Sequence, residues 1–329
     1  MKPSQIACTL QHLISIRQPT MIWGPPGVGK SRVVEQAAAE MGYQYLDLRL
    51  PLFDAVDLRG IPTVKGNSTV WLTPSMFPKS GKWVINLDEL VQAMPIVQSA
   101  ASSLILDRRI GEYTLPKEVS MVATGNRETD RAATNRMPSH IANRFTHLNF
   151  EVDAQDWITW AFANKINEMV IAFIAFRPDL LHKFEPTQKA FPTPRSWEFV
   201  SRIISGDGVD ECLLEIVGGT VGEGAATEFV GFTRVFREMP DYETICKRPE
   251  DTKIPENVAA RYAVATMLAR STEQKTMSPV MQYVNRMPAE FQVLTVNDMT
   301  KRNKKLAETS SYINWASKNK DLLLNATSR

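Results

Sequence analysis

Five short apolar stretches recur along the first half of the chain, and helix-patterned segments separate them. The stretches cover residues 20–23, 44–50, 83–88, 119–125 and 146–151. Apolar runs of about four to eight residues bounded by turn residues are typical of fully buried strands. Strands that alternate with helices in this way predict an α/β fold with a doubly wound parallel sheet. Such a sheet binds its ligand at the carboxyl ends of the strands.

Two other segments alternate around turn residues and predict β-hairpins. Residues 61–72 turn at a Gly-Asn pair, and residues 108–116 turn at a glycine. The hairpins carry Trp71, Arg109 and Tyr113, which either contact a substrate or cover the core. Apolar side chains are common on ordinary protein surfaces, so cover is the simpler interpretation.

The rest of the chain is patterned as helices. Helical periodicity begins at residue 153, and two further apolar-periodic segments lie at residues 291–305 and 312–324. We therefore expect three parts. They are an α/β core over residues 1–152, a helical region over residues 153–270 and a helical C-terminal appendage over residues 271–329.

Composition and charge exclude several classes of protein. The 329 residues are 43% hydrophobic and 22% charged, and the formal net charge is +2. Because this charge creates no strong global field, binding to nucleic acid or an acidic membrane would need a local patch. The longest unbroken apolar stretch, residues 169–176, is far shorter than the ~18 residues of a membrane span. The N-terminus also lacks the layout of a signal peptide, so we expect no membrane association.

The cysteines and histidines predict neither disulfides nor a zinc site. The three cysteines lie far apart without a CxxC pair, and the four histidines show no ligand spacing. Unpaired thiols are typical of a reducing compartment. We therefore expect a cytoplasmic protein without structural zinc.

A glycine-rich turn between the first strand and a helical segment carries the strongest motif. It reads Gly24-Pro25-Pro26-Gly27-Val28-Gly29-Lys30-Ser31, with Arg32 next, and fits G-x-x-x-x-G-K-[ST]. The glycines let backbone N–H groups surround phosphate oxygens, and the helix N-terminus adds partial positive charge. Lys30 would reach the outer phosphates, and the Ser31 hydroxyl would hold Mg²⁺. A chance glycine turn is the weaker alternative, so the motif predicts a nucleotide site at residues 24–32.

A pair of acidic residues ends the third apolar stretch. Asp88 would bind Mg²⁺, and Glu89 would act as general base on the attacking water. Acidic residues also cap helices that follow strands, so such a pair is a weak signal alone. The phosphate loop earlier in the chain makes the catalytic interpretation the stronger one.

The phosphate loop and the acidic pair together resemble an AAA+ ATPase, and further positions follow in that family's order. Asn126 ends the fourth apolar stretch and matches sensor 1, the polar residue that orients the water beside Glu89. Arg144 matches the arginine finger that is inserted into the neighbouring subunit's site, although Asn143 replaces the usual aspartate before it. Arg195, in a Thr-Pro-Arg sequence, matches sensor 2, which touches the γ-phosphate.

Each of these matches has a plainer interpretation. Asn126 could be an ordinary strand-ending turn residue. Arg144 could form a surface ion pair within its own subunit, and Arg136 is a rival for the finger. A Pro-Arg sequence is common at helix starts, so Arg195 gains its meaning only from its place in the series.

More narrowly, residues 1–205 are similar to the MoxR branch of the AAA+ family. The similarity rests on Asp57-Leu58-Arg59-Gly60 before the first hairpin, on Met94-Pro95 after the acidic pair and on the Thr-Pro-Arg sequence. It implies a five-stranded sheet of order 5-1-4-3-2 and a helical lid that follows it. It further implies a hexameric ring that uses ATP and Mg²⁺ to remodel or assemble a protein client. A partner with a von Willebrand A-type domain would be a separate protein, because this chain has no Asp-x-Ser-x-Ser motif.

Two other functions stay open on the sequence alone. A nucleic-acid motor, or a nucleotide switch in a restriction or replication complex, would use the same ATP site and the basic run at residues 301–305. A solvated helix face is the simpler interpretation of that run. A nucleotide-dependent structural subunit would bind ATP without turnover. Glu89, Asn126 and Arg144 would then have no catalytic role.

Overall fold

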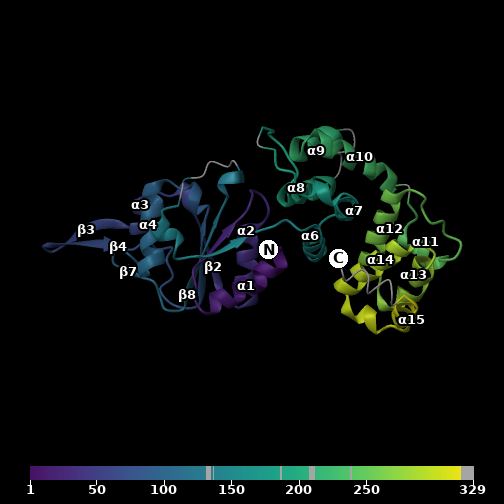
Figure 1. Ribbon diagram of the computed structural model, residues 1–329, viewed down its shortest axis with the longest axis horizontal. Coiled ribbons are helices and arrows are strands. Elements are labelled where there is room, and N and C mark those ends of the chain that lie inside the picture. Colours follow the sequence, from purple (N-terminus) through teal and green to yellow (C-terminus); the bar gives the residue numbers. More distant parts are fainter. Residues whose placement is uncertain (131–134, 136, 186, 207–211, 238, 320–329) are drawn as a thin grey trace. The chain divides into compact units, whose positions relative to one another are not determined.

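The chain folds into two compact units, residues 1–153 and residues 154–329 (Figure 1). The computed structural model describes residues 1–329 except 131–134, 136, 186, 207–211, 238 and 320–329. The boundary that the sequence places after residue 152 lies next to this division. Among the described residues, no helix is long and apolar enough to cross a membrane.

Within the described residues, the sheet of the first unit has five parallel strands in the order β2-β5-β8-β1-β9. The strands are β1 (Thr20–Trp23), β2 (Gln44–Arg49), β5 (Trp83–Asp88), β8 (Val119–Gly125) and β9 (Thr146–Asn149). Counted along the chain without the hairpin strands, and starting from the β9 edge, the order is 5-1-4-3-2, the order that the family resemblance implies. The element labels differ from these numbers only because the hairpins add strands to the count.

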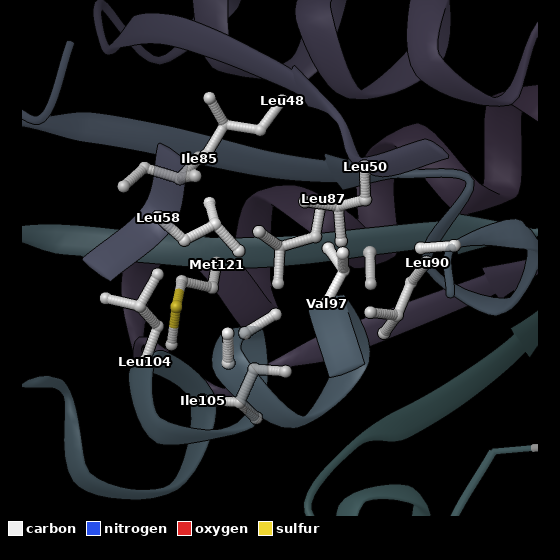
Figure 2. Packing of buried hydrophobic residues seen from close by; sticks show 14 of the residues in the cluster. Leu48, Leu50, Leu58, Ile85, Leu87, Leu90, Val97, Leu104, Ile105 and Met121 are labelled. Atoms are coloured by element: carbon white, nitrogen blue, oxygen red, sulfur yellow. The ribbon is translucent and has the colours of Figure 1, made fainter. Parts of the chain in front are cut away.

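Helices cover both faces of this sheet because its strands are apolar on both sides. On one face lie α1 (Pro3–Ser15) and α2 (Lys30–Glu40), which bury Ile6, Leu10 and Val34 against Ile22 and Val84. On the other face lie α3 (Ala55–Arg59), α4 (Pro95–Asp107) and α5 (Ser139–Ala142). Figure 2 shows Leu58, Val97 and Leu104 packed there against Ile85, Leu87 and Met121. The result is a three-layer unit that holds the strand ends rigidly.

Both predicted hairpins are present. The first pairs β3 (Ile61–Lys65) with β4 (Ser68–Leu72), and the second pairs β6 (Arg109–Ile110) with β7 (Tyr113–Thr114). The Tyr113 ring stacks on Phe77 at 4.9 Å between centroids, and its hydroxyl donates to the Pro78 carbonyl at 2.7 Å. Tyr113 is therefore cover for the core, as the simpler interpretation has it, whereas a substrate contact by Trp71 or Arg109 stays a prediction.

The second unit is helical in its described part. Its α-helices are α6 (Ala154–Ala163), α7 (Glu168–Phe176), α8 (Pro194–Ile204), α9 (Leu213–Val221), α10 (Glu223–Arg237), α11 (Tyr242–Lys247), α12 (Val258–Ser271), α13 (Met277–Val284), α14 (Ala289–Arg302) and α15 (Ser310–Lys318). Phe173, Trp197 and Phe229 join α7, α8 and α10, with ring centroids between 5.2 and 5.6 Å apart. A second cluster joins α12 to the helices after it, through Leu268 and Phe291 among others.

The boundary expected after residue 270 falls inside α12 and is not a division between cores. Val264 and Leu268, before the boundary, share one hydrophobic cluster with Val280 and Phe291, after it. The described residues from 271 to 319 therefore pack as part of the second unit. Apolar periodicity predicts the helices α14 and α15 but does not show which neighbour their apolar faces pack against.

A buried carboxylate in the second unit makes its stability depend on pH. Asp298 on α14 is 9% exposed, and its Oδ1 accepts a hydrogen bond from Gln155 Nε2 at 3.3 Å. Burial raises the pKa of Asp298 from 3.8 to about 6, while Lys301 and Gln155 oppose the shift. Because the pKa is raised in the folded state, this group's contribution is most favourable below about pH 4 and worsens as the pH rises towards 6. At neutral pH the folded unit must hold a buried charge.

Asp298→Asn should therefore stabilise the second unit at pH 7.5. We expect its unfolding temperature to rise on the order of 5 °C at pH 7.5 and to change little at pH 4.5, measured by calorimetry. Asp251→Asn, at an exposed position of the same unit, is the matched control and should shift neither transition. An unchanged or lower unfolding temperature for Asp298→Asn at pH 7.5 would contradict the assignment.

Candidate active site

The glycine-rich loop connects β1 to α2 at the carboxyl end of the sheet. Gly27 and Gly29 have φ of 75° and 95°, a left-handed region that side chains with a Cβ rarely adopt. Gly24 packs so closely that an added Cβ would lie 3.0 Å from Phe150 Cβ. Gly29 is the N-cap of α2, and no side chain caps the helix there. The first N–H groups of α2 therefore face the loop, as an anion-binding helix start requires.

Lys30 holds this loop together and joins it to the end of β8. Its Nζ donates to the carbonyls of Gly24 and Pro25, each at 2.8 Å, and to Asn126 Oδ1 at 2.9 Å. The predicted phosphate-binding lysine and the predicted sensor 1 are thus direct partners, although they lie far apart in the sequence. An ammonium in this position carries the positive charge of the loop.

Ser31 and Asp88 touch, as residues that share one metal ion must. Ser31 Oγ donates to Asp88 Oδ1 at 2.6 Å, and the Thr124 hydroxyl donates to the same carboxylate oxygen. Asp88 is 6% exposed, so these hydrogen bonds compensate for the burial of its charge. A hydroxyl beside a carboxylate is a set of hard oxygen ligands, which Mg²⁺ prefers. These residues fit the metal that the sequence predicts.

Glu89 has an unusual backbone that turns it out of its strand. Its φ is 57° and its ψ is 37°, a left-handed conformation that costs a non-glycine residue about 1 kcal/mol or more. The Glu89 N–H donates to Thr124 Oγ1 at 3.3 Å. One buried hydroxyl therefore binds both the side chain of Asp88 and the backbone of Glu89. The side chain of Glu89 is half-buried at the carboxyl end of β5.

Thr124 is a residue of this cluster that motif reading missed. It lies on β8, two residues before Asn126, which directly follows the strand, and the alternation of side chains along the strand was the available signal. We expect Thr124→Val to lower the ATP turnover about tenfold or more, because a hydrogen bond to a charged group contributes about 2 kcal/mol. Thr124→Ser keeps the hydroxyl and should stay near the wild-type rate. The check is kcat at saturating ATP and Mg²⁺; a valine variant as fast as the serine variant would contradict the role.

A polar cluster continues from Asp88 toward the edge strand β2. Asn86 Nδ2 donates to Asp47 Oδ1 at 2.8 Å and to the Tyr45 hydroxyl at 3.1 Å. Burial, and after it the nearby charge of Asp88, raises the pKa of the Asp47 carboxyl, although Asn86 and Tyr45 oppose the shift. Arg49 Nε lies 3.8 Å from Asp88 Oδ2. The site thus has a second carboxylate beside the predicted metal ligand, which no motif indicated.

The predicted arginines stand on other elements than this cluster. Arg144 follows α5 on the surface, and within the described part of the chain its side chain forms no ion pair. Arg195 is exposed on the first turn of α8, in the second unit, where Thr193 caps the helix. Arg32 pairs with Glu35 at 3.1 Å on the surface of α2. Arg136, the rival finger, lies outside the described residues.

A comparison with protein families agrees with this geometry. Residues 19–145 match the family model of the AAA domain, dynein-related subfamily. That range runs from the start of β1 to the start of β9 and includes Lys30, Asp88 and Asn126. The first unit is therefore similar to an AAA domain over these residues.

Individual relatives are distant. Midasin from Giardia intestinalis is 27% identical over 173 residues, which is 50% of this chain and 4% of midasin. A structure of NtrX from Brucella abortus in complex with ADP covers 97% of this chain and 68% of its own, with 13% identity and a TM-score of 0.44. The RuvB Holliday junction branch migration motor of Thermotoga maritima covers 95% and 86%, with 12% identity and a TM-score of 0.37. These two structural likenesses carry no inference about the function of this chain.

Proposed function

We propose that this chain is the ATPase of a MoxR-like ring, in which Mg²⁺-dependent ATP hydrolysis remodels or assembles a protein client. The observation that carries the ATPase chemistry is a cluster of polar side chains at the carboxyl ends of β1, β5 and β8, joined by hydrogen bonds in two groups. Lys30 donates to Asn126, and the next residue, Ser31, donates to Asp88. Glu89 joins the second group through Thr124.

The residues of the cluster divide the work of phosphoryl transfer among them. The loop amides and Lys30 bind the phosphates, and Lys30 exchanges carbonyl partners for phosphate oxygens. Ser31 and Asp88 would hold Mg²⁺, which when bound offsets phosphate charge. Glu89 accepts the proton of the attacking water, and Asn126 orients that water. Thr124 keeps the carboxylate of Asp88 and the backbone of Glu89 in register.

Two arginines would complete the site from outside the cluster. Arg144 is exposed, and among the described residues no carboxylate neutralises it, which supports a role toward a neighbouring subunit and not an internal ion pair. An arginine supplied in trans stabilises the charge of the transition state. Arg195, exposed at a helix start in the predicted lid, would touch the γ-phosphate. Such sharing of one site by two subunits requires an oligomer, and the MoxR resemblance implies that this oligomer is a hexameric ring.

The client is proposed to be a protein, with a separate von Willebrand A-type partner. The basic run does not favour nucleic acid, because the guanidinium of Arg302 donates to the Ala269 carbonyl at 3.2 Å and so takes part in helix packing. Lys301, Lys304 and Lys305 remain at the surface. A salt titration of DNA binding separates the two functions, since phosphate contacts give a steep slope of affinity against salt.

The proposal is tested by three measurements on the wild-type protein. We expect ATP turnover that stops when EDTA removes Mg²⁺, ATP-dependent assembly to a hexamer by mass measurement, and no salt-steep DNA binding. Turnover without assembly would contradict the ring. Binding of ATP without turnover would instead favour a nucleotide-dependent structural subunit.

A further inference from the structure

His147 bridges two parts of the first unit that the proposed mechanism treats separately. Its Nδ1 accepts a hydrogen bond from Trp23 Nε1 at 2.8 Å, and its Nε2 lies 2.9 Å from the Ala142 carbonyl oxygen. The indole nitrogen only donates and the carbonyl only accepts. The ring of His147 therefore accepts at Nδ1 and donates at Nε2, which is the neutral form with one tautomer.

The two partners of His147 stand at functional positions. Trp23 is the last residue of β1, directly before Gly24 of the phosphate loop. Ala142 is the last residue of α5, two residues before the proposed finger Arg144. The Trp23 and His147 rings also stack, with centroids 6.0 Å apart and planes at 17°. The bridge therefore connects the strand that carries the phosphate loop to the helix end that carries the finger.

Among the described residues, the backbone of the finger itself is held by contacts within its own turn and by one long hydrogen bond. The Arg144 N–H donates to the Ile141 carbonyl at 3.0 Å, inside the same short turn. The Arg144 carbonyl accepts from Gln18 Nε2 only at 3.5 Å. Phe145 anchors the next residue, since it is 7% exposed. From Thr146 onward the backbone pairs with β1, beginning with the Thr146 N–H, which donates to the Pro19 carbonyl at 2.9 Å. The contact of His147 with Ala142 adds a side-chain tie between β1 and the helix end before Arg144.

We infer that His147 is a positioning residue for the Arg144 finger, which it holds in fixed register with the phosphate loop of its own chain. This inference rests on the proposed function, because it requires that Arg144 act on the neighbouring subunit. A shared site has two halves, the nucleotide site of one subunit and the finger of its neighbour, and the inference predicts which half fails. Loss of His147 should damage the finger that a chain offers and spare the nucleotide site that it holds.

Three variants separate the hydrogen bonds from the packing of the ring. His147→Phe keeps an aromatic ring for stacking and removes both hydrogen bonds. His147→Gln keeps one acceptor and one donor at the end of the side chain. Trp23→Phe removes only the indole donor and guards against a misfolded His147 variant. His12→Phe, at an exposed histidine on α1, is the matched control.

For His147→Phe we expect unchanged ATP affinity and a kcat at least about tenfold lower, because displacing a catalytic group by about 1 Å can cost about a hundredfold. Trp23→Phe should lower kcat in the same direction, and His147→Gln should retain most of it. His12→Phe should behave as wild type. Wild-type turnover of both His147→Phe and Trp23→Phe would overturn the inference.

Mixing experiments then show which half of the site has failed. His147→Phe should recover activity when co-assembled with Glu89→Gln, which offers an intact finger, and should not recover with Arg144→Ala. The opposite pattern would mean that His147 serves its own nucleotide site and would overturn the inference. The pair Glu89→Gln and Arg144→Ala is the reference mixture. If that pair fails in verified mixed oligomers, the shared site itself is wrong, whereas recovery of that pair alone would overturn only the role of His147.

Discussion

Replacing Lys30 by alanine should abolish nucleotide binding. The variant loses the ammonium that offsets the charge of the outer phosphates, and it loses the contacts with Gly24, Pro25 and Asn126 that shape the loop. Calorimetric titration with ATP and Mg²⁺ should show no measurable heat of binding. Lys65→Ala, at an exposed position on β3, is the control and should bind as wild type. An ATP affinity unchanged in Lys30→Ala would contradict the nucleotide site.

Glu89→Gln should bind ATP yet hydrolyse it at least ~10²-fold more slowly, because the amide cannot accept the proton of the attacking water. The fold at this position should survive, since the hydrogen bond with Thr124 uses the Glu89 backbone N–H and not its side chain. Single-turnover hydrolysis and ATP affinity are measured on the same preparation. Glu118→Gln, at an exposed acidic position of the same unit, should leave both unchanged. Normal turnover by Glu89→Gln would contradict the role of Glu89 as general base and would leave it only a structural role.

The centre of the sheet could be predicted from the sequence because the strands β1, β5 and β8 are buried on both faces. Continuous apolar runs predict β1, β5 and β8 with their observed ends. The run at residues 146–151 extends past β9, which ends at Asn149. That strand stops where its neighbour stops, because Trp23 opposite Asn149 is the last residue of β1. A strand end depends on the partner strand, so local periodicity alone could not locate it.

The residues of the candidate site could be predicted from the sequence only where a motif lies within one continuous segment. The phosphate loop and the acidic pair are local motifs, and the structure brings Lys30 into contact with Asn126 and Ser31 into contact with Asp88. The role of Thr124 depends on the register of β8 against β5, which no motif encodes. The bridge made by His147 likewise requires β9 to lie beside β1. The pattern of residues along one chain does not predict which distant segments contact each other.

The central claim is that two neighbouring subunits share each active site, with Glu89 acting within its own chain and Arg144 acting on the next. Each of the variants Glu89→Gln and Arg144→Ala should be nearly inactive alone. In random mixed rings about a quarter of the interfaces combine an intact Glu89 with an intact Arg144.

The most direct test is to co-assemble equal amounts of these two inactive variants and to confirm by mass that mixed oligomers form. ATP turnover of the mixture is then measured against each variant alone. We predict clear recovery, close to a quarter of the wild-type rate. No recovery in verified mixed oligomers would contradict a finger supplied in trans by Arg144, and it would move that role to Arg136 or to no arginine of this chain.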